Sequence, residues 1–165
     1  MSSQLFSTVV DTPVGVLTIV ASDDGLRAIL WPDDDPSRVR LAATTEDPAH
    51  PVIAATVGQL VEYFDGERTD FDVPLDPVGT EFQRAAWAVL CSIPYATTLS
   101  YGEQAERMGD RRKARAVGAA NGRNPISIVV PCHRVVGANG ALTGFAGGTD
   151  TKAWLLDHER RQLSR

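Results

Sequence analysis

Apolar and β-branched side chains occur in three short runs within the first thirty residues, and turn-forming residues separate these runs. The intervening segments, residues 12–15 and 22–25, carry the Pro, Gly and Asp residues that favour tight turns. We therefore predict an antiparallel β-meander whose strands are Phe6–Val10, Val16–Ala21 and Leu26–Trp31.

A helical pattern of apolar residues follows a polar stretch. Residues 32–50 are polar and contain proline, so we expect a loop there. In residues 51–65 the apolar side chains recur at helical spacing, and Gly66 is a suitable end for a helix. Phe71–Val73 is a candidate for a short strand, and residues 76–79 have the composition of a linker.

The second half begins with a capped helix. Thr80 is a candidate N-cap for a helix that runs to about Ser92, and Pro94 ends it. Phe82, Trp87 and Leu90 are among its apolar positions. Cys91 lies near its end, and we expect this side chain to pack in the core.

Two short helices come next, followed by a longer one. Ser100 caps a helix over Tyr101–Met108, and Glu103 completes the spacing of a capping box. A second helix is expected over about 112–121, after a tight break at glycine. Short helices joined in this way predict a helix-turn-helix. The final helix is expected over about 151–162.

These elements predict an α/β (α+β) protein in two parts. Residues 1–75 would form a small antiparallel sheet with one helix, 76–79 a linker, and 80–165 a mostly helical domain that contains the helix-turn-helix. The 165 residues suffice for one ordinary domain or two small ones. Because 43% of them are hydrophobic, the chain can bury a core.

The composition limits the compartment and the cofactors. No apolar run approaches the ~20 residues that span a bilayer, and the first residues lack the basic and apolar parts of a signal peptide. We therefore expect a cytoplasmic protein, with no membrane partner. Its two cysteines, Cys91 and Cys132, would be free thiols there. They cannot supply a four-ligand zinc site, and the three histidines lack metal-ligand spacing, so we expect no metal and no cofactor.

Charge is distributed unevenly along the chain. The net charge of −5 argues against a nucleic-acid partner. Between Glu106 and Arg134, however, seven basic residues accompany only two acids, Glu106 and Asp110. This segment is either a local phosphate-binding patch or an ordinary solvated helix face.

One cysteine has a distinctive setting. Cys132 and His133 follow Pro131, directly after the apolar run Ile126–Val130. The thiolate is the nucleophilic form of cysteine, and a neighbouring imidazole shifts a thiol pKa from ~8.5 toward neutrality. Many cysteines are merely small buried hydrophobes, so the dipeptide alone leaves both interpretations open.

The longer motif resembles a known family. Its parts, in order, are Arg115-Ala116-Val117-Gly118, Asn124-Pro125, Pro131-Cys132-His133-Arg134-Val135, Gly147-Gly148, Lys152, and Trp154-Leu155-Leu156 with Glu159. Over residues 80–165 their order and spacing are similar to those of the O-6-alkylguanine-DNA alkyltransferases, the methylated-DNA–protein-cysteine methyltransferases that repair alkylated guanine. Residues 1–75 match only in pattern. The resemblance implies a ribonuclease-H-like fold for that first part.

The resemblance also implies roles at the reacting centre. Cys132 would accept the alkyl group, in a single turnover, from O-6-alkylguanine and also from O-4-alkylthymine. His133 would reach Cys132 through a water, and Glu159 would orient His133. Asn124 would brace the turn that presents Cys132, and Tyr101 would donate a hydrogen bond to the departing base.

Further residues are implied to contact DNA and the flipped base. Arg115 would fill the stack that the base leaves on flipping through the minor groove, which offsets part of a cost of a few kcal/mol. The implied partner is double-stranded DNA containing alkylated guanine, bound by a monomer that could cluster along the duplex. The DNA-contacting set is Ser100, Tyr101, Ala114, Arg115, Gly118 and Arg134, and the substrate pocket is Val135, Phe145, Ala146 and Gly147.

Small residues mark one face of the second short helix. Arg115, Gly118 and Gly122 share a face at helical spacing. A face without bulky side chains can approach the walls of the minor groove, which is only ~6 Å wide. Tight helix packing is the other explanation for these glycines.

The chain departs from the family in the pocket wall, and three other functions compete with alkyl transfer. Many members carry Tyr-Ser or Tyr-Gly where this chain has Phe145-Ala146, so a hydroxyl of the pocket wall is missing. The alkyltransferase-like proteins bind lesions without repairing them, but they replace the cysteine that is kept here. A Cys-His hydrolase usually draws its partners from distant segments. A pure helix-turn-helix binder would have no use for Cys132 and Glu159.

Overall fold

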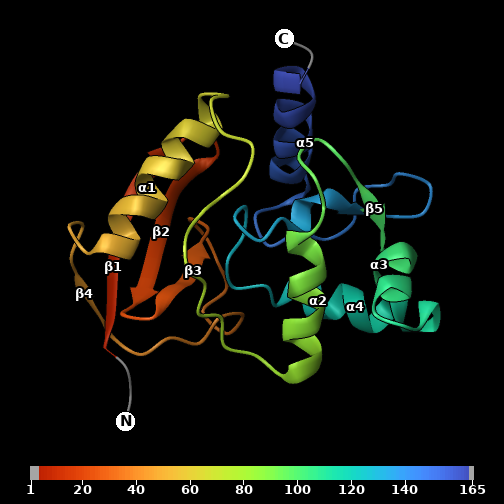
Figure 1. Ribbon diagram of the computed structural model, residues 1–165, viewed down its shortest axis with the longest axis horizontal. Helices are drawn as coiled ribbons and strands as arrows, with labels where there is room; N and C mark the ends of the chain where they lie inside the picture. The colour runs from red at the N-terminus through yellow and green to blue at the C-terminus, as the bar shows by residue number, and fades with distance from the viewer. Residues whose placement is uncertain (1–3, 164–165) are drawn as a thin grey trace. The chain divides into compact units, whose positions relative to one another are not determined.

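The computed structural model describes residues 4–163, and the chain divides into two compact units after Val78. The first unit contains a four-stranded sheet in the order β3-β2-β1-β4, covered on one face by helix α1 (Figure 1). Strands β1, β2 and β3 pair antiparallel, whereas β4 runs parallel to β1. The bounds are β1 Leu5–Thr12, β2 Gly15–Ser22, β3 Gly25–Leu30, β4 Thr44–Glu46 and α1 Pro51–Phe64.

The core of the first unit lies between the sheet and α1. Strand β2 buries Leu17 and Ile19, and α1 buries Leu60 and Tyr63 against them. The expected meander and the helix over 51–65 are confirmed. The prediction that residues 32–50 are all loop is wrong, because Thr44–Glu46 form strand β4. Its three residues, Thr-Thr-Glu, are all exposed and carry no apolar signal.

The segment after α1 is fixed to strand β3. The backbone N–H of Leu26 donates to Pro74 O at 2.8 Å, and that of Asp76 donates to Leu26 O at 2.8 Å. Gly25 allows this approach, because a Cβ at that position would lie 2.8 Å from Pro74 O. The strand expected over 71–73 is absent. Asp76, which we placed in a linker, is instead tied to β3.

The Asp76 carboxylate strengthens this attachment. It accepts hydrogen bonds from Ser22 Oγ at 2.5 Å and from the Arg27 guanidinium at 2.7 Å. Burial raises the pKa of Asp76, but these two donors outweigh it and leave the pKa below its usual value.

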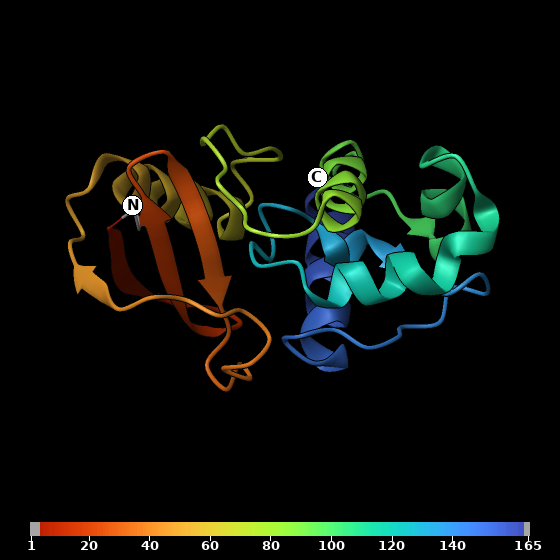
Figure 2. The ribbon, with the colours of Figure 1, turned by 90° about the horizontal axis from the view of Figure 1, so that it is seen from below.

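The second unit consists of helices and short segments. Its elements are α2 Glu81–Cys91, β5 Leu99–Ser100, α3 Tyr101–Arg107, the 3₁₀ turn η1 Arg111–Lys113, α4 Ala114–Gly122, the 3₁₀ turn η2 Cys132–Arg134, β6 Val135–Val136 and α5 Thr149–Leu163. Strands β5 and β6 form a two-residue parallel pair. Helix α4 packs beside α2 and α3 (Figure 2).

Most helix ends match the sequence signals. Thr80 and Ser100 each form a complete capping box, with Gln83 and Glu103 respectively. The expected second short helix begins as the 3₁₀ turn η1 and becomes α-helical at Ala114. The prediction that Cys91 packs in the core is wrong, because this residue lies exposed on α2.

Buried polar contacts hold the helix-turn-helix together. The indole N–H of Trp87 on α2 donates to Ala120 O on α4 at 2.9 Å. Gln104 on α3 and Asn121 on α4 exchange two side-chain hydrogen bonds, at 2.8 and 3.0 Å, and Gln104 also donates to Ala86 O. Because unpaired buried amides would be costly, these contacts fix α4 relative to α2 and α3.

Candidate active site and DNA-binding surface

Cys132 begins the turn η2, after a buried and tightly folded loop. Every residue from Asn124 to Val136 is buried, and Ile128 adopts a positive φ of 74°, an uncommon conformation for a β-branched residue. Asn124 bridges the two sides of this loop: its Nδ2 donates to Val130 O at 2.8 Å, and its Oδ1 accepts from Ile126 N at 3.0 Å. Its position therefore allows Asn124 to brace the turn that presents Cys132.

His133 and Glu159 form a fully buried pair. His133 Nε2 lies 2.7 Å from Glu159 Oε2. A carboxylate only accepts hydrogen bonds, so Nε2 carries the proton and Nδ1 presents its lone pair. Among the described residues, Nδ1 is buried and has no hydrogen-bond partner. Burial lowers the pKa of His133 and outweighs the raising effect of Glu159, so the imidazole is neutral and Nδ1 can accept a proton.

Glu159 is held from three sides. Besides His133, the Arg134 guanidinium donates to both carboxylate oxygens, at 2.9 and 3.0 Å, and the backbone N–H of Ala96 donates at 3.0 Å. Burial alone would raise the pKa of Glu159, but the hydrogen bonds and charges of His133 and Arg134 hold it far below the usual range. The carboxylate is thus ionised and fixed in orientation.

Arg134 requires a correction to the predicted DNA-binding set. It is only 5% exposed, and its third donor group binds Ile93 O at 2.8 Å. The guanidinium also lies 5.6 Å from the centre of the Tyr95 ring. With its donors directed to Glu159 and Ile93, Arg134 stabilises the ionised carboxylate and has almost no exposed surface to offer a phosphate.

Lys152 on α5 is a site residue to which the sequence analysis gave no role. It is 1% exposed, and its Nζ lies 5.9 Å from the centre of the Tyr101 ring. Burial lowers the pKa of Lys152, whereas charge on the neighbouring Cys132 acts in the opposite direction. A signal was present, because Lys152 and Glu159 share the apolar face of α5 with Leu155 and Leu156.

A cavity of about 570 Å³ lies between the start of α3, the face of α4 and the loop before α5. Four of the predicted DNA-contacting residues line it: Tyr101, Ala114, Arg115 and Gly118. Gly118 lies beside the tyrosine, where a Cβ would make an ordinary van der Waals contact with the Tyr101 ring, at 3.6 Å. Gly122, Thr143 and Gly144 complete the lining.

The remaining predicted residues lie close by, in different surroundings. Ser100 is half-buried, and its hydroxyl caps α3 by accepting from Glu103 N. Val135 is fully buried in β6. Phe145, Ala146 and Gly147 lie in the loop before α5 and are not among the residues that line the cavity. Thr143 and Gly144 of the same loop line it instead. Thr143 is not among the predicted residues, and its only signal in the sequence is a hydroxyl beside the Gly-rich stretch.

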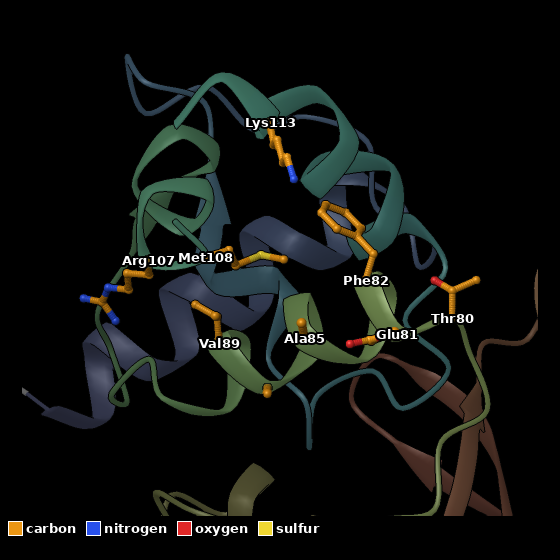
Figure 3. Close-up of a pocket in the computed structure, with 9 residues that line it drawn as sticks. Thr80, Glu81, Phe82, Ala85, Val89, Arg107, Met108 and Lys113 are labelled. Carbon is orange, nitrogen blue, oxygen red and sulfur yellow. The ribbon is translucent and has the colours of Figure 1, made fainter. Parts of the chain in front are cut away.

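A second, larger hollow of about 780 Å³ lies on another face of the helical unit (Figure 3). Phe82 and Val89 of α2 face it together with Met108, and Lys113 Nζ lies 5.8 Å from the centre of the Phe82 ring. None of the predicted site residues lines this hollow.

Within residues 4–163, His, Cys, Asp and Glu side chains nowhere gather in a group of three that could hold a metal ion. None of the helices in that range is long and apolar enough to cross a membrane.

Comparison with known proteins gives matches for both units. Residues 81–161 match the DNA binding domain of 6-O-methylguanine DNA methyltransferase, and residues 5–77 match its ribonuclease-like domain. The methylated-DNA–protein-cysteine methyltransferase of Mycolicibacterium paratuberculosis is 52% identical over 92% of this chain and 90% of its own length. The protein of that name from Methanosarcina mazei is 40% identical over 96% of this chain and 99% of its own.

Solved structures agree with these matches. A crystal structure of Mycobacterium tuberculosis OGT in complex with DNA has a TM-score of 0.86 and 44% identity, covering 96% of this chain and 94% of that one. The mixed α/β fold with a helical C-terminal part is thereby confirmed. The chain belongs to the 6-O-methylguanine DNA methyltransferase family.

Proposed function

We propose that this protein repairs DNA by moving the alkyl group of O-6-alkylguanine, and of O-4-alkylthymine, onto Cys132, once per protein molecule. The observation that carries the proposal is the buried hydrogen-bond chain from His133 Nε2 to Glu159, which leaves Nδ1 as an unprotonated base next to Cys132 in the sequence. The family names of the relatives concern the same chemistry.

The transfer can be written with each bond and proton in place. His133 Nδ1 takes the Cys132 proton, through a bridging water, while Glu159 stabilises the imidazolium that forms. The sulfur then attacks the alkyl carbon in line, a C–S bond forms and the C–O6 bond breaks. The electron pair of that bond remains on guanine, which takes up one proton at its ring nitrogen, and this uptake balances the proton that left Cys132. Because no step removes the alkyl group from sulfur, the protein acts only once.

Lys152 and Tyr101 would assist at the two ends of this displacement. The Lys152 ammonium stabilises the thiolate, since the charge interaction between Lys152 and Cys132 favours both ionised forms. Tyr101 lines the cavity and would donate a hydrogen bond to the base as negative charge grows on it.

Lys152→Met is expected to slow transfer about tenfold at neutral pH, with recovery at higher pH. Methionine keeps the length of the side chain but removes the charge next to the thiolate, so a higher pH is needed to form it. Single-turnover rates from pH 6 to 10, about the range over which thiols and lysines titrate, test this. An unshifted pH profile would show that Lys152 serves packing alone.

The proposed partner is double-stranded DNA that contains alkylated guanine, docked on α4 by the minor groove. Helix α4 presents Arg115 at the cavity, and the glycines at 118 and 122 keep its face narrow. The base would be flipped into the site. We further propose that the protein works as a monomer in the cytoplasm, where a reducing environment keeps Cys132 a free thiol.

Arg115→Ala is expected to reduce repair of duplex DNA far more than repair of a single strand or of the free modified base. Arg115 matters only where a stack must be held open, at a cost of a few kcal/mol. A plain phosphate contact would instead weaken binding to all duplexes and lower the salt slope by about one unit. Transfer rates on the three substrates at two salt concentrations separate these cases.

The matched control is Arg161→Ala, which removes an exposed arginine paired with Asp157 on α5. This variant should transfer at the normal rate on all three substrates. Equal losses on the three substrates for Arg115→Ala would contradict intercalation and indicate damage within the site itself.

A further inference from the structure

Thr143 joins the loop before α5 to the start of α3 through one short contact. Its Oγ1 lies 2.5 Å from the Tyr101 hydroxyl oxygen, across 42 positions of sequence. Both side chains line the cavity that also contains Arg115. The tyrosine ring is approached from other directions by Lys152 Nζ, at 5.9 Å from its centre, and by Gly118. The Thr143 contact is the hydrogen bond that the Tyr101 hydroxyl makes within the described residues.

Backbone hydrogen bonds close the turns on either side of Thr143. On one side of Thr143, Gly137 N donates to Ala141 O at 2.8 Å, and on the other Gly148 N donates to Phe145 O at 2.9 Å. These backbone bonds close the two turns that flank the residue. The hydroxyl contact with Tyr101 is thus additional to the bonds that fold the loop.

Two touching hydroxyl groups share one hydrogen bond, so one donates and the other accepts. When the threonine donates, the phenol oxygen accepts and its own proton is left to point into the cavity. A phenol that accepts a hydrogen bond is also a stronger donor, because linked hydrogen bonds polarise one another. Serine or threonine at 143 can do this, whereas an apolar residue cannot.

We propose that Thr143 is a positioning residue for alkyl transfer, which donates its hydroxyl proton to Tyr101 and so directs the Tyr101 proton toward the departing guanine. The proposal rests on the function proposed above and extends it to a residue of the pocket wall. Thr143 lies two positions before Phe145-Ala146, where this chain lacks the hydroxyl of many family members.

The test is a double-mutant cycle between Thr143→Val and Tyr101→Phe, with Thr143→Ser as the conservative variant. Valine keeps the branched shape and removes the hydroxyl. Single-turnover transfer is measured on a duplex with one O-6-methylguanine, at saturating protein. Thr143→Val should be about five- to tenfold slower, the effect of one neutral hydrogen bond. Thr143→Ser should stay within about twofold of the unchanged protein.

In the Tyr101→Phe background, Thr143→Val should cause no further loss beyond about twofold, because the partner hydroxyl is already gone. Affinity for the same duplex and the melting temperature should be unchanged. The control is Thr149→Val, an exposed threonine at the start of α5, which should transfer normally.

Three results would overturn the proposal. The first is a Thr143→Val rate equal to that of the unchanged protein. The second is an equal loss with and without the Tyr101 hydroxyl, which would assign Thr143 to direct DNA contact or to loop shape. The third is failure of Thr143→Ser to restore the rate. If the unchanged protein transfers no alkyl group at all, the proposed function fails instead, and the two failures are therefore distinguishable.

Discussion

Cys132→Ser is expected to abolish alkyl transfer and to leave DNA binding intact. Serine is a near-isostere, so the buried turn η2 and its brace at Asn124 should form as before. Its hydroxyl has a far higher pKa than a thiol and yields almost no oxyanion near neutral pH. Transfer of a labelled methyl group from DNA, together with a gel shift on the same duplex, measures the two properties separately.

Cys91→Ser is the matched control, because Cys91 is the other cysteine and lies exposed on α2. It should accept one methyl group per molecule, as the unchanged protein does. Stoichiometric transfer by Cys132→Ser would assign the acceptor role elsewhere.

Glu159→Gln is expected to slow transfer about 100-fold, the lower end of what general-base catalysis contributes. The amide has nearly the same shape as the carboxylate but cannot stabilise the imidazolium of His133. The charge of Glu159 also raises the pKa of His133. Removing that charge therefore makes His133 a weaker base for the Cys132 proton, and a higher pH is needed to form the thiolate. The pH profile of the single-turnover rate should therefore move to higher pH.

The same substitution should lower stability, with a defined pH dependence. It leaves the buried Arg134 guanidinium without its carboxylate, and breaking a buried pair costs about 3–5 kcal/mol. The pKa of Glu159 is lower in the folded protein than in the unfolded chain, so its stabilisation is present above pH ~4.3 and is lost on acidification. The difference in unfolding free energy between the unchanged protein and Glu159→Gln should be greatest at neutral pH and should shrink as the pH falls below ~4.3.

Asp157→Asn provides the control on the same helix. Asp157 pairs with Arg161 on the surface of α5, with more than half of each side chain exposed, and such pairs contribute little. Its rate and its stability should match those of the unchanged protein. If Glu159→Gln also retains both the normal rate per folded molecule and the normal pH profile, His133 does not act through Glu159.

Much of the fold follows from local patterns in the sequence. The strands of the meander, helix α1 and the capping boxes at Thr80 and Ser100 depend on neighbouring residues, so their signals lie within short windows. Strand β4 does not. It consists of three exposed polar residues, and pairing with β1 across 39 positions places it in the sheet. Exposure of Cys91 likewise depends on what packs against α2.

The site residues divide in the same way. The Cys-His motif and its spacing predict that Cys132 is the acceptor, but they do not show where Arg134 points. Its burial arises because η2 packs against α5, which brings Glu159 within 2.9 Å of the guanidinium. Lys152 could have been recognised as a charge on an apolar helix face. Thr143 could not, because its contact with Tyr101 exists only after the loop before α5 folds onto α3.

The most direct test of the account is an intact mass measurement after incubation with excess duplex containing one O-6-methylguanine. We expect the whole protein population to gain the mass of a single methyl group in place of hydrogen, and peptide mapping to place it on Cys132. Unmodified protein with repaired DNA would show turnover, as in a hydrolase. Unmodified protein bound to unrepaired DNA would show lesion binding alone, and either result would contradict stoichiometric transfer.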